Sequence, residues 1–116
     1  MISKKFRLNE KELGKVLRKK KPFFSYSLIA NTFPNPLWHN RCAILLSGKQ
    51  TKWSVNRNYF RRTLYDMSAP YLADSGLDIV FVAKKWTVYN YKDAQQVAEF
   101  KRDIIFLWKT ILKKNP

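Results

Sequence analysis

A small α/β fold, a two-layer sandwich with helices laid on one sheet, is predicted by three observations. Residues 23–33 alternate with a period of two, which indicates a strand with one packed face. Residues 77–83 form a nearly continuous apolar run rich in β-branched side chains, which favours a central strand covered on both faces. Three other segments place their apolar residues at helical spacing. The predicted order is helix, strand, strand, helix, strand, helix.

The first predicted helix begins after Asn9, which can cap it, and Glu12 then completes a capping-box pattern. Its narrow apolar stripe consists of Leu13, Val16 and Leu17. A basic run at residues 18–21 follows and is closed by Pro22. Two roles for this run stay open: a solvated helix end that suits the helix dipole, and a phosphate contact.

The predicted strands are bounded by turn-forming residues. Along residues 23–33, one face should carry Phe24, Tyr26, Leu28 and Ala30, and the other Ser25, Ser27, Ile29, Asn31 and Phe33. A turn at residues 34–36 precedes a short second strand at residues 42–46. Asp93 should cap the last helix, with Gln96 at the capping-box position. The buried stripe of that helix comprises Val97, Phe100, Ile104, Leu107, Trp108 and Ile111.

The middle helix, predicted over residues 52–65, has two chemically opposed sides. At about 100° per residue, one apolar arc collects Trp53, Phe60, Leu64 and Met67. A second arc collects Arg57, Asn58, Arg61 and Arg62, with Ser54 and Tyr65 between the two arcs. The first carboxylate along the helix is Asp66, so the guanidinium groups repel one another unless a polyanion binds. Nucleic acid is therefore the leading partner.

The chain as a whole is strongly basic. Its 23 Lys and Arg residues against 8 Asp and Glu residues give a net charge of +15 on 116 residues. Residues 13–65 carry eleven basic residues and no acidic one. A solvated surface normally mixes both signs, so this distribution favours a polyanionic partner over a merely soluble basic protein.

Length and composition indicate one domain, residues 1–116, because 46% hydrophobic residues are enough to bury a core. No apolar run approaches the ~20 residues of a membrane span, and the N-terminus lacks the features of a signal peptide. The single cysteine, Cys42, excludes an internal disulfide and is expected to be buried. The cytoplasm is the expected compartment.

No self-contained active site is visible in the sequence. His39, the one histidine, lies in a turn rich in Pro and Asn and is expected to be a surface residue. The carboxylates are expected to be caps, helix-surface charges and loop residues, and only Asp66 with Asp78 is considered as an acid–base pair. We therefore predict no catalytic residue and no metal ligand in this chain, so any reacting groups come from a partner.

RNA is favoured over DNA as the polyanion. The basic residues lie on three separate elements: the first helix with its tail, residues 49–62, and the pair Lys84 and Lys85. A protein that reads duplex DNA typically places one helix in the major groove. A broad basic surface flanked by aromatic residues suits folded RNA and single strands instead.

Three stretches of the sequence carry a resemblance to a known family. Residues 57–62, preceded by Lys49 and Lys52, look like an arginine-asparagine-arginine signature helix. Residues 7–17 look like that family's first helix, and residues 78–85 like its central strand with a basic pair at the end. Over about residues 5–112, the chain resembles the protein component of bacterial ribonuclease P. The resemblance implies a mixed sheet with a left-handed strand–helix–strand crossover.

The same resemblance implies a function, as the RNA-binding protein subunit of ribonuclease P. The ribonuclease P RNA would carry the catalytic centre and its Mg²⁺ ions, while the protein binds that RNA. The protein would also hold the 5′ leader of precursor tRNA in a cleft between the first helix and the sheet. The residues implied for the RNA subunit are Lys49, Lys52, Arg57, Asn58, Arg61 and Arg62. Those implied for the leader cleft are Leu13, Leu17, Asn31, Phe33, Lys84 and Lys85.

The chain departs from the family pattern at several of these positions. Tyr59 stands where a basic residue is usual, and it is expected either to stack on a base or to pack. Leu13 and Leu17 replace phenylalanines and Asn31 replaces a frequent aromatic, which removes stacking worth ~1–3 kcal/mol per base. Residues 47–50 match the family's serine-lysine-lysine pattern imperfectly.

Two alternative functions remain open from the sequence. The chain can be a non-catalytic binder of structured RNA, such as a ribosome-associated protein or an RNA chaperone. It can also be a self-sufficient nuclease, which the missing active site disfavours. The sequence does not indicate an oligomeric state.

Overall fold

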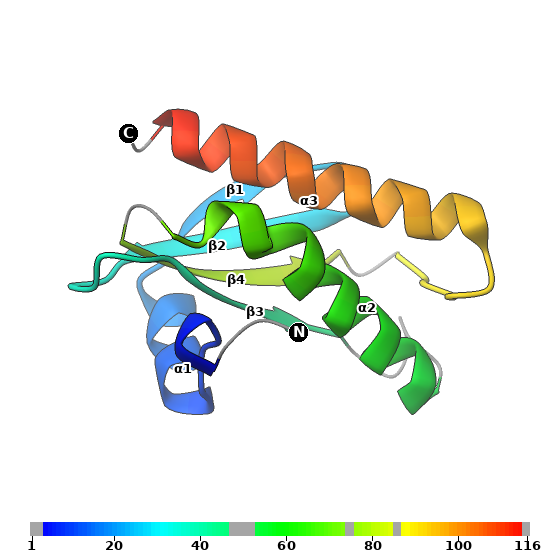
Figure 1. Cartoon of the computed structure of the whole chain (residues 1–116), viewed down its shortest axis with the longest axis horizontal. Helices are drawn as coiled ribbons and strands as arrows, with labels where there is room; N and C mark the ends of the chain where they lie inside the picture. The colour runs from blue at the N-terminus through cyan, green and yellow to red at the C-terminus, as the bar shows by residue number, and fades with distance from the viewer. Residues whose placement is uncertain (1–3, 47–52, 74–75, 85–86, 115–116) are drawn as a thin grey trace.

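The computed structural model describes residues 4–46, 53–73, 76–84 and 87–114 (Figure 1). Within these ranges three α-helices and two short 3-10 helices accompany a four-stranded sheet, which confirms the predicted α/β class. The elements in chain order are η1 Lys4–Phe6, α1 Glu10–Arg18, β1 Lys21–Phe24, β2 Leu28–Pro34, β3 Arg41–Leu45, α2 Ser54–Ser68, η2 Ala69–Tyr71, β4 Leu77–Ala83 and α3 Ala94–Lys114.

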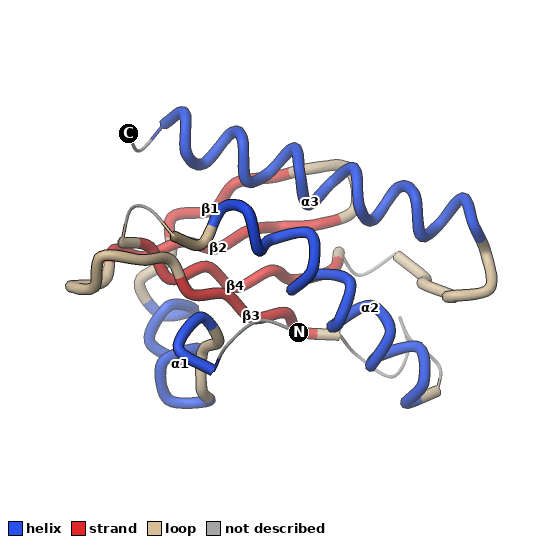
Figure 2. Tube along the Cα trace, viewed as in Figure 1, coloured by secondary structure: helices blue, strands red, loops and turns tan. Residues whose placement is uncertain are grey.

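The sheet is mixed and has the strand order β1-β2-β4-β3 (Figure 2). β2 runs antiparallel to both β1 and β4, whereas β3 and β4 are parallel and are joined by α2. The apolar run of residues 77–83 is therefore a central strand, as predicted. In Figure 1 β3 and β4 run to the right, α2 passes in front of the sheet and β4 lies above β3. This crossover is left-handed, opposite to the usual hand of parallel connections.

The prediction of one strand over residues 23–33 is wrong, because the chain turns back within it. β1 ends at Phe24 and β2 begins at Leu28. Ser25 closes the turn: its N–H donates to the Leu28 carbonyl over 2.9 Å, and its Oγ accepts from the Leu28 N–H over 3.1 Å. Residues 25–27 contain no Gly, Pro or Asn, so the period of two continues through the turn without a breaker signal. As a result Phe24 and Tyr26, expected on the packed face, are 60% and 65% exposed.

The main core lies between the sheet and the pair α2 and α3. Its largest side chains are aromatic and fully buried: Phe60, Phe81, Phe100 and Trp108. The rings of Phe60 and Phe100 meet edge to face with centroids 4.9 Å apart. The predicted stripe of the last helix is confirmed from Phe100 to Ile111, while Val97 is only half-buried. Cys42 is buried in the same core, as expected.

On α2 the predicted apolar arc is partly wrong. Phe60 and Leu64 are fully buried and Met67 packs against the core, but Trp53 is 61% exposed. Tyr65, which was placed between the two arcs, is buried. The reason is that α2 packs against both α3 and β3, so its buried side is wider than a single narrow arc and is shifted away from Trp53.

Both predicted helix caps form. The Glu12 N–H donates to Asn9 Oδ1 over 2.9 Å and the Asn9 N–H donates to Glu12 Oε1 over 3.0 Å, which completes the capping box. At α3, Asp93 Oδ1 accepts from the Gln95 and Gln96 N–H groups. The Gln96 side chain instead accepts from the Asn90 N–H, so the second capping box is not formed.

α1 packs on the other face of the sheet, against β2 and β4. Leu28 and Ala30 of β2 belong to the main core, so the alternating residues Ile29, Asn31 and Phe33 point toward the α1 side. Val16 is the residue of α1 that is fully buried there. Among the helices of the described ranges, none has the length and apolar character that crossing a bilayer requires.

Candidate RNA interface

The exposed side of α2 carries the predicted arginines. Arg61 and Arg62 are exposed, as is Asn58, whereas Arg57 is half-buried. Arg61 Nη1 donates a long hydrogen bond of 3.4 Å to Asn58 Oδ1. Within the described part of the chain, neither Arg61 nor Arg62 forms an ion pair with a carboxylate. The guanidinium groups of Arg61 and Arg62 therefore face solvent, and no carboxylate of the described residues compensates their charge.

A residue far from α2 in the sequence completes this surface. Arg7 follows η1, in a segment that lies along β3: the Leu8 N–H donates to the Cys42 carbonyl over 3.2 Å. Together with α2 this segment forms a hollow of about 230 Å³, lined by Arg7, Asn58, Arg61, Arg62 and Tyr65. No pattern in the sequence predicts that Arg7 lies beside α2, because this depends on where the N-terminal segment crosses the sheet edge.

Two tyrosines of α2 differ in their position relative to the basic surface, which only Tyr65 lines. Tyr65 is 6% exposed, and burial raises the pKa of its hydroxyl while the nearby Arg7 and Arg61 charges lower it. Tyr59 lies on another side of the helix, where its ring contacts Phe60 and Tyr91 with centroids 5.4 and 5.7 Å away. Of the two roles considered for Tyr59, the structure shows packing. Stacking of Tyr59 on a base stays a prediction.

A second hollow, of about 330 Å³, lies between α1 and the sheet, where the leader cleft was predicted. Lys11 and Lys15, one turn apart on α1, line it together with Phe33, Arg41 and Asp78. The Lys15 Nζ lies 5.8 Å from the centre of the Phe33 ring. Neither lysine was among the predicted cleft residues, although their spacing of four places both on one side of the helix.

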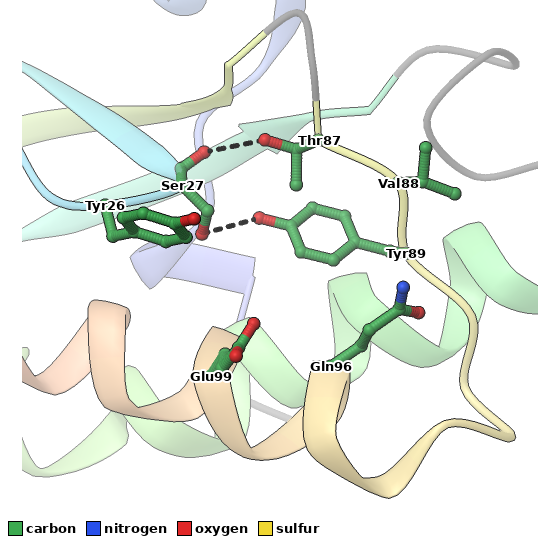
Figure 3. A pocket seen from close by; sticks show the side chains of 7 residues that line it. All are labelled: Tyr26, Ser27, Thr87, Val88, Tyr89, Gln96 and Glu99. Atoms are coloured by element: carbon green, nitrogen blue, oxygen red, sulfur yellow. Dashed lines mark hydrogen bonds between the residues drawn. The ribbon is translucent and has the colours of Figure 1, made fainter.

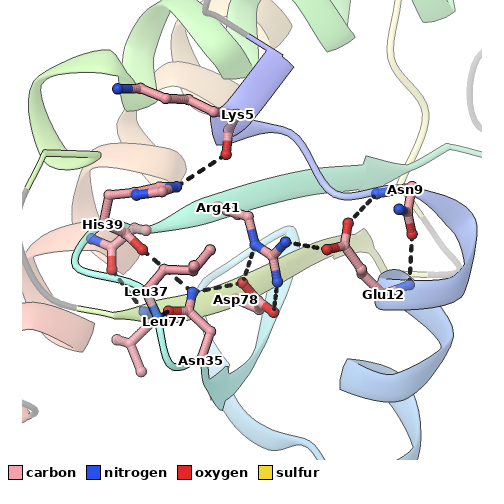
Figure 4. Close-up of polar contacts among 10 residues, drawn as sticks. Lys5, Asn9, Glu12, Asn35, Leu37, His39, Arg41, Leu77 and Asp78 are labelled. Atoms are coloured by element: carbon pink, nitrogen blue, oxygen red, sulfur yellow. Dashed lines mark hydrogen bonds and ion pairs between the residues drawn. The ribbon is translucent and has the colours of Figure 1, made fainter.

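Arg41 ties α1 to the sheet at the floor of this hollow (Figure 4). Its Nε and Nη2 donate to the two carboxylate oxygens of Asp78 over 2.8 and 2.7 Å, and its Nη1 pairs with Glu12. Asn35 Nδ2 also donates to Asp78, over 2.8 Å. The bond to Asp78 raises the pKa of the Arg41 guanidinium above its already high value. Arg41 lies within residues 13–65, which contain no acidic residue. It is thus neutralised by one carboxylate before this stretch, Glu12, and one after it, Asp78.

The predicted cleft residues are only partly brought together. Leu13 and Leu17 on α1 and Phe33 on β2 are half-buried, and of these three Phe33 lines the hollow between α1 and the sheet. Asn31, two residues before Phe33 on β2, is 3% exposed, and its Oδ1 has no hydrogen-bond partner among the described residues. Asn31 therefore offers almost no surface to RNA in this conformation. Lys84 follows β4, and its N–H donates to the Ser27 carbonyl over 2.9 Å. The predicted residues Lys49, Lys52 and Lys85 lie outside the described residues.

Two carboxylates differ from their predicted roles. Asp78 is buried on β4 and forms an ion pair with Arg41, whereas Asp66 is exposed on α2, so the structure does not show the acid–base pair that was considered for these two residues. Asp103 is 4% exposed and accepts hydrogen bonds from Ser27. Among the described residues, no three Asp, Glu, His or Cys side chains gather as a metal site would require. This finding does not test the prediction that any Mg²⁺ comes with an RNA partner.

His39 occupies the loop between β2 and β3, as expected. Its Nε2 lies 3.1 Å from the Lys5 carbonyl, and its ring meets Phe6 edge to face with centroids 5.2 Å apart. The histidine therefore holds the N-terminal segment against the loop.

These features define a class of protein: a small α/β protein that carries a basic helix across the left-handed connection of a mixed sheet and binds RNA. The family described as Ribonuclease P matches residues 2–111 of the sequence. The chain therefore belongs to the ribonuclease P protein family, whose members are protein subunits of that enzyme.

Solved structures share the fold. The ribonuclease P protein of Staphylococcus aureus superposes with a TM-score of 0.72 at 17% identity, covering 91% of this chain and 94% of that one. A mutant of the Staphylococcus aureus protein, described as defective in mRNA degradation activity, gives 0.74 at 17% identity over 93% and 89% of the two chains. The Thermotoga maritima protein gives 0.62 at 18% identity over 92% of each chain. No curated protein matches the sequence.

Proposed function

We propose that this protein helps a catalytic RNA subunit to remove the 5′ leader of precursor tRNA by binding both RNAs. The proposal is supported by one observation: the protein has two separate hollows lined by basic side chains. One lies on α2 beside Arg7, and the other lies between α1 and the sheet. The RNA subunit binds at the first and the leader at the second. Catalysis and its Mg²⁺ belong to the RNA subunit, and the cytoplasm is the compartment in which the protein meets both partners.

The physical contribution of the protein is electrostatic. Two RNA molecules repel each other, and a net charge of +15 between them replaces part of the counterion atmosphere that would otherwise be needed. The benefit is therefore largest when Mg²⁺ and salt are low. The lysines of the α1 hollow contact the leader backbone, and half-buried Leu13, Leu17 and Phe33 contact its bases weakly, because only one of the three has a ring.

The first experiment measures cleavage of precursor tRNA by the ribonuclease P RNA at low Mg²⁺, with and without the protein. The protein should accelerate cleavage, and the gain should shrink as Mg²⁺ or salt rises. No gain at any salt concentration contradicts the proposal. The protein freed of all RNA serves as the control, and cleavage by that sample would instead favour a self-sufficient nuclease.

A second experiment separates the proposal from a general RNA-binding function. The affinity of the complex with the RNA subunit is measured for precursor and for mature tRNA. The precursor should bind more tightly, and Lys15→Ala should reduce that difference without changing the affinity for mature tRNA. Equal affinity for both tRNAs indicates a general binder of structured RNA.

Charge-removal variants test the α2 surface directly. Arg61→Ala and Arg62→Ala should each weaken binding of the RNA subunit and lower the slope of log affinity against log salt by about 1. Lys109→Ala, which removes an exposed charge from α3, is the matched control and should have a smaller effect. If all three variants lose the same affinity, the RNA subunit does not bind at α2.

A further inference from the structure

A third hollow, of about 290 Å³, lies away from both surfaces described above (Figure 3). It opens between the turn that joins β1 to β2, the segment that follows β4, and the first half of α3. The residues that line it are Tyr26, Ser27, Thr87, Val88, Tyr89, Gln96 and Glu99. Among the described residues that line it there is no lysine or arginine, so this lining differs in chemistry from those of the two basic hollows.

The floor of the hollow is held in place by a buried carboxylate. Asp103 on α3 accepts from the Ser27 N–H over 3.1 Å and from the Ser27 hydroxyl. That hydroxyl in turn accepts from the Tyr89 hydroxyl over 3.1 Å, and Thr87 Oγ1 donates to the Ser27 carbonyl over 3.4 Å. These bonds fix the turn, the segment after β4 and α3 relative to one another, so the hollow is preorganised for a ligand.

The groups at the mouth are suited to a flat ligand with a polar edge. Tyr26 is 65% exposed and Val88 is 59% exposed, and both border the hollow. Gln96 and Glu99 lie three residues apart on α3 and so stand side by side. Gln96 Oε1 accepts from the Asn90 N–H over 2.7 Å, which leaves Nε2 as the atom that can donate to a ligand. Figure 3 shows the Glu99 carboxylate pointing up from α3 toward the space between the two tyrosines.

This combination selects among the chemical groups that an RNA presents. A carboxylate repels phosphate, so the hollow does not take the backbone. A base can stack on the Tyr26 ring and turn its edge toward α3. Guanine offers two adjacent N–H donors and one carbonyl acceptor on its Watson–Crick edge, which complements one carboxylate beside one amide donor. Uracil offers a single N–H donor between two acceptors and fits less well.

We propose that this hollow binds an unpaired guanine of RNA, with the base stacked on Tyr26, its two N–H groups donating to Glu99 and its carbonyl accepting from Gln96. The inference rests on the proposed function for the presence of an RNA partner, and it adds a base-specific contact to a protein whose other proposed RNA contacts do not distinguish one base from another. The guanine belongs either to the leader or to the RNA subunit, since the recognition chemistry is the same for both.

The test measures the affinity of the protein for oligouridine and for the same oligomer with one central guanine. The guanine oligomer should bind about tenfold more tightly, because hydrogen bonds to a charged group are among the stronger ones. Glu99→Gln should abolish this preference while slightly raising the affinity for oligouridine, since a negative charge has been removed. Glu10→Gln, an equal charge change on the exposed surface of α1, should raise both affinities and keep the preference.

Two further variants complete the test. Tyr26→Ala should weaken binding of the guanine oligomer by about tenfold, and Tyr26→Phe should restore it because the ring is retained. Equal affinity for the two oligomers in the unchanged protein, or an equal preference in the Glu99→Gln variant, overturns the proposal.

The source of the guanine is found in the complex with the RNA subunit. If Glu99→Gln weakens only the binding of precursor tRNA that has a guanine in its leader, the bound guanine is in the leader. If it weakens binding of the RNA subunit itself, the base is in that RNA. The guanine preference of the isolated protein is independent of cleavage, so a failure of the proposed function and a failure of this inference are distinguishable.

Discussion

The two faces of the sheet are built by different means. On the α2 and α3 face, Phe60, Phe81, Phe100 and Trp108 pack with no exposed surface. On the α1 face, the one fully buried side chain of the helix is Val16, and the helix is tied down by the ion pairs of Arg41. The two faces therefore separate stability from adaptability. A dry aromatic core holds α2 rigidly, whereas α1 borders a cleft that is partly polar and partly open.

The largest effect should come from the aromatic core. Phe60→Ala should lower the free energy of unfolding by about 3–5 kcal/mol, because a fully buried ring leaves a cavity. Arg61→Ala, on the exposed side of the same helix, should change it by less than about 0.5 kcal/mol. Urea unfolding followed by circular dichroism measures both. Similar losses in the two variants would show that the faces of α2 are assigned wrongly. Arg57→Ala is a less clean test, because Arg57 is half-buried.

The next effect concerns the attachment of α1. Arg41→Met should cost about 2–4 kcal/mol, because the Asp78 carboxylate, whose side chain is 9% exposed, is left without its cation. Arg102→Met is the matched control. Arg102 is 65% exposed and 3.9 Å from Asp103, so its removal should have little effect. If Arg41→Met is as mild as Arg102→Met, the ion pairs of Arg41 with Glu12 and Asp78 contribute little to stability.

A smaller effect is expected at the cleft between α1 and the sheet. Leu17 is half-buried, so Leu17→Phe can place a ring at the gap between α1 and the sheet without filling a closed core. The new ring should strengthen binding of precursor tRNA, but not mature tRNA, by up to about tenfold through base stacking. Affinity is measured in the complex with the RNA subunit. A gain that is equal for both tRNAs would place the leader elsewhere.

The smallest effect is a pH dependence of the aromatic face. Burial raises the pKa of Tyr89 from 10.0 to about 12. The neutral phenol is thus favoured in the folded state, and its stabilisation is present below pH 10 and is lost as the pH rises toward 12. Tyr89→Phe should cost about 1 kcal/mol at pH 7 through the lost hydrogen bond to Ser27. The variant should also lose stability less steeply than the parent between pH 10 and 12. An equally steep loss would assign the alkaline transition to other groups, such as Cys42, whose pKa is also raised to about 12 by burial.

Local patterns were enough to predict several elements. The apolar run of residues 77–83 favoured a covered strand, and Asn9 with Glu12 formed the predicted capping box, because both signals depend on neighbouring residues. The cationic side of α2 was also predicted correctly at Arg61 and Arg62, since helical geometry places Arg61 one turn after Arg57 and Arg62 one turn after Asn58. The turn at residues 25–27 was missed, because Ser25 closes it by hydrogen bonds that leave the alternation intact.

Periodicity and composition are enough to specify the fold class, the central strand, the basic character of α2 and the family resemblance. The folded structure, in contrast, sets which charges remain uncompensated. It neutralised Arg41 with Glu12 and Asp78, brought Arg7 beside α2, and buried Asp103 under a turn. Each of these contacts joins residues far apart in the chain, and Coulomb energy depends on distance in space, so no local pattern can foretell it.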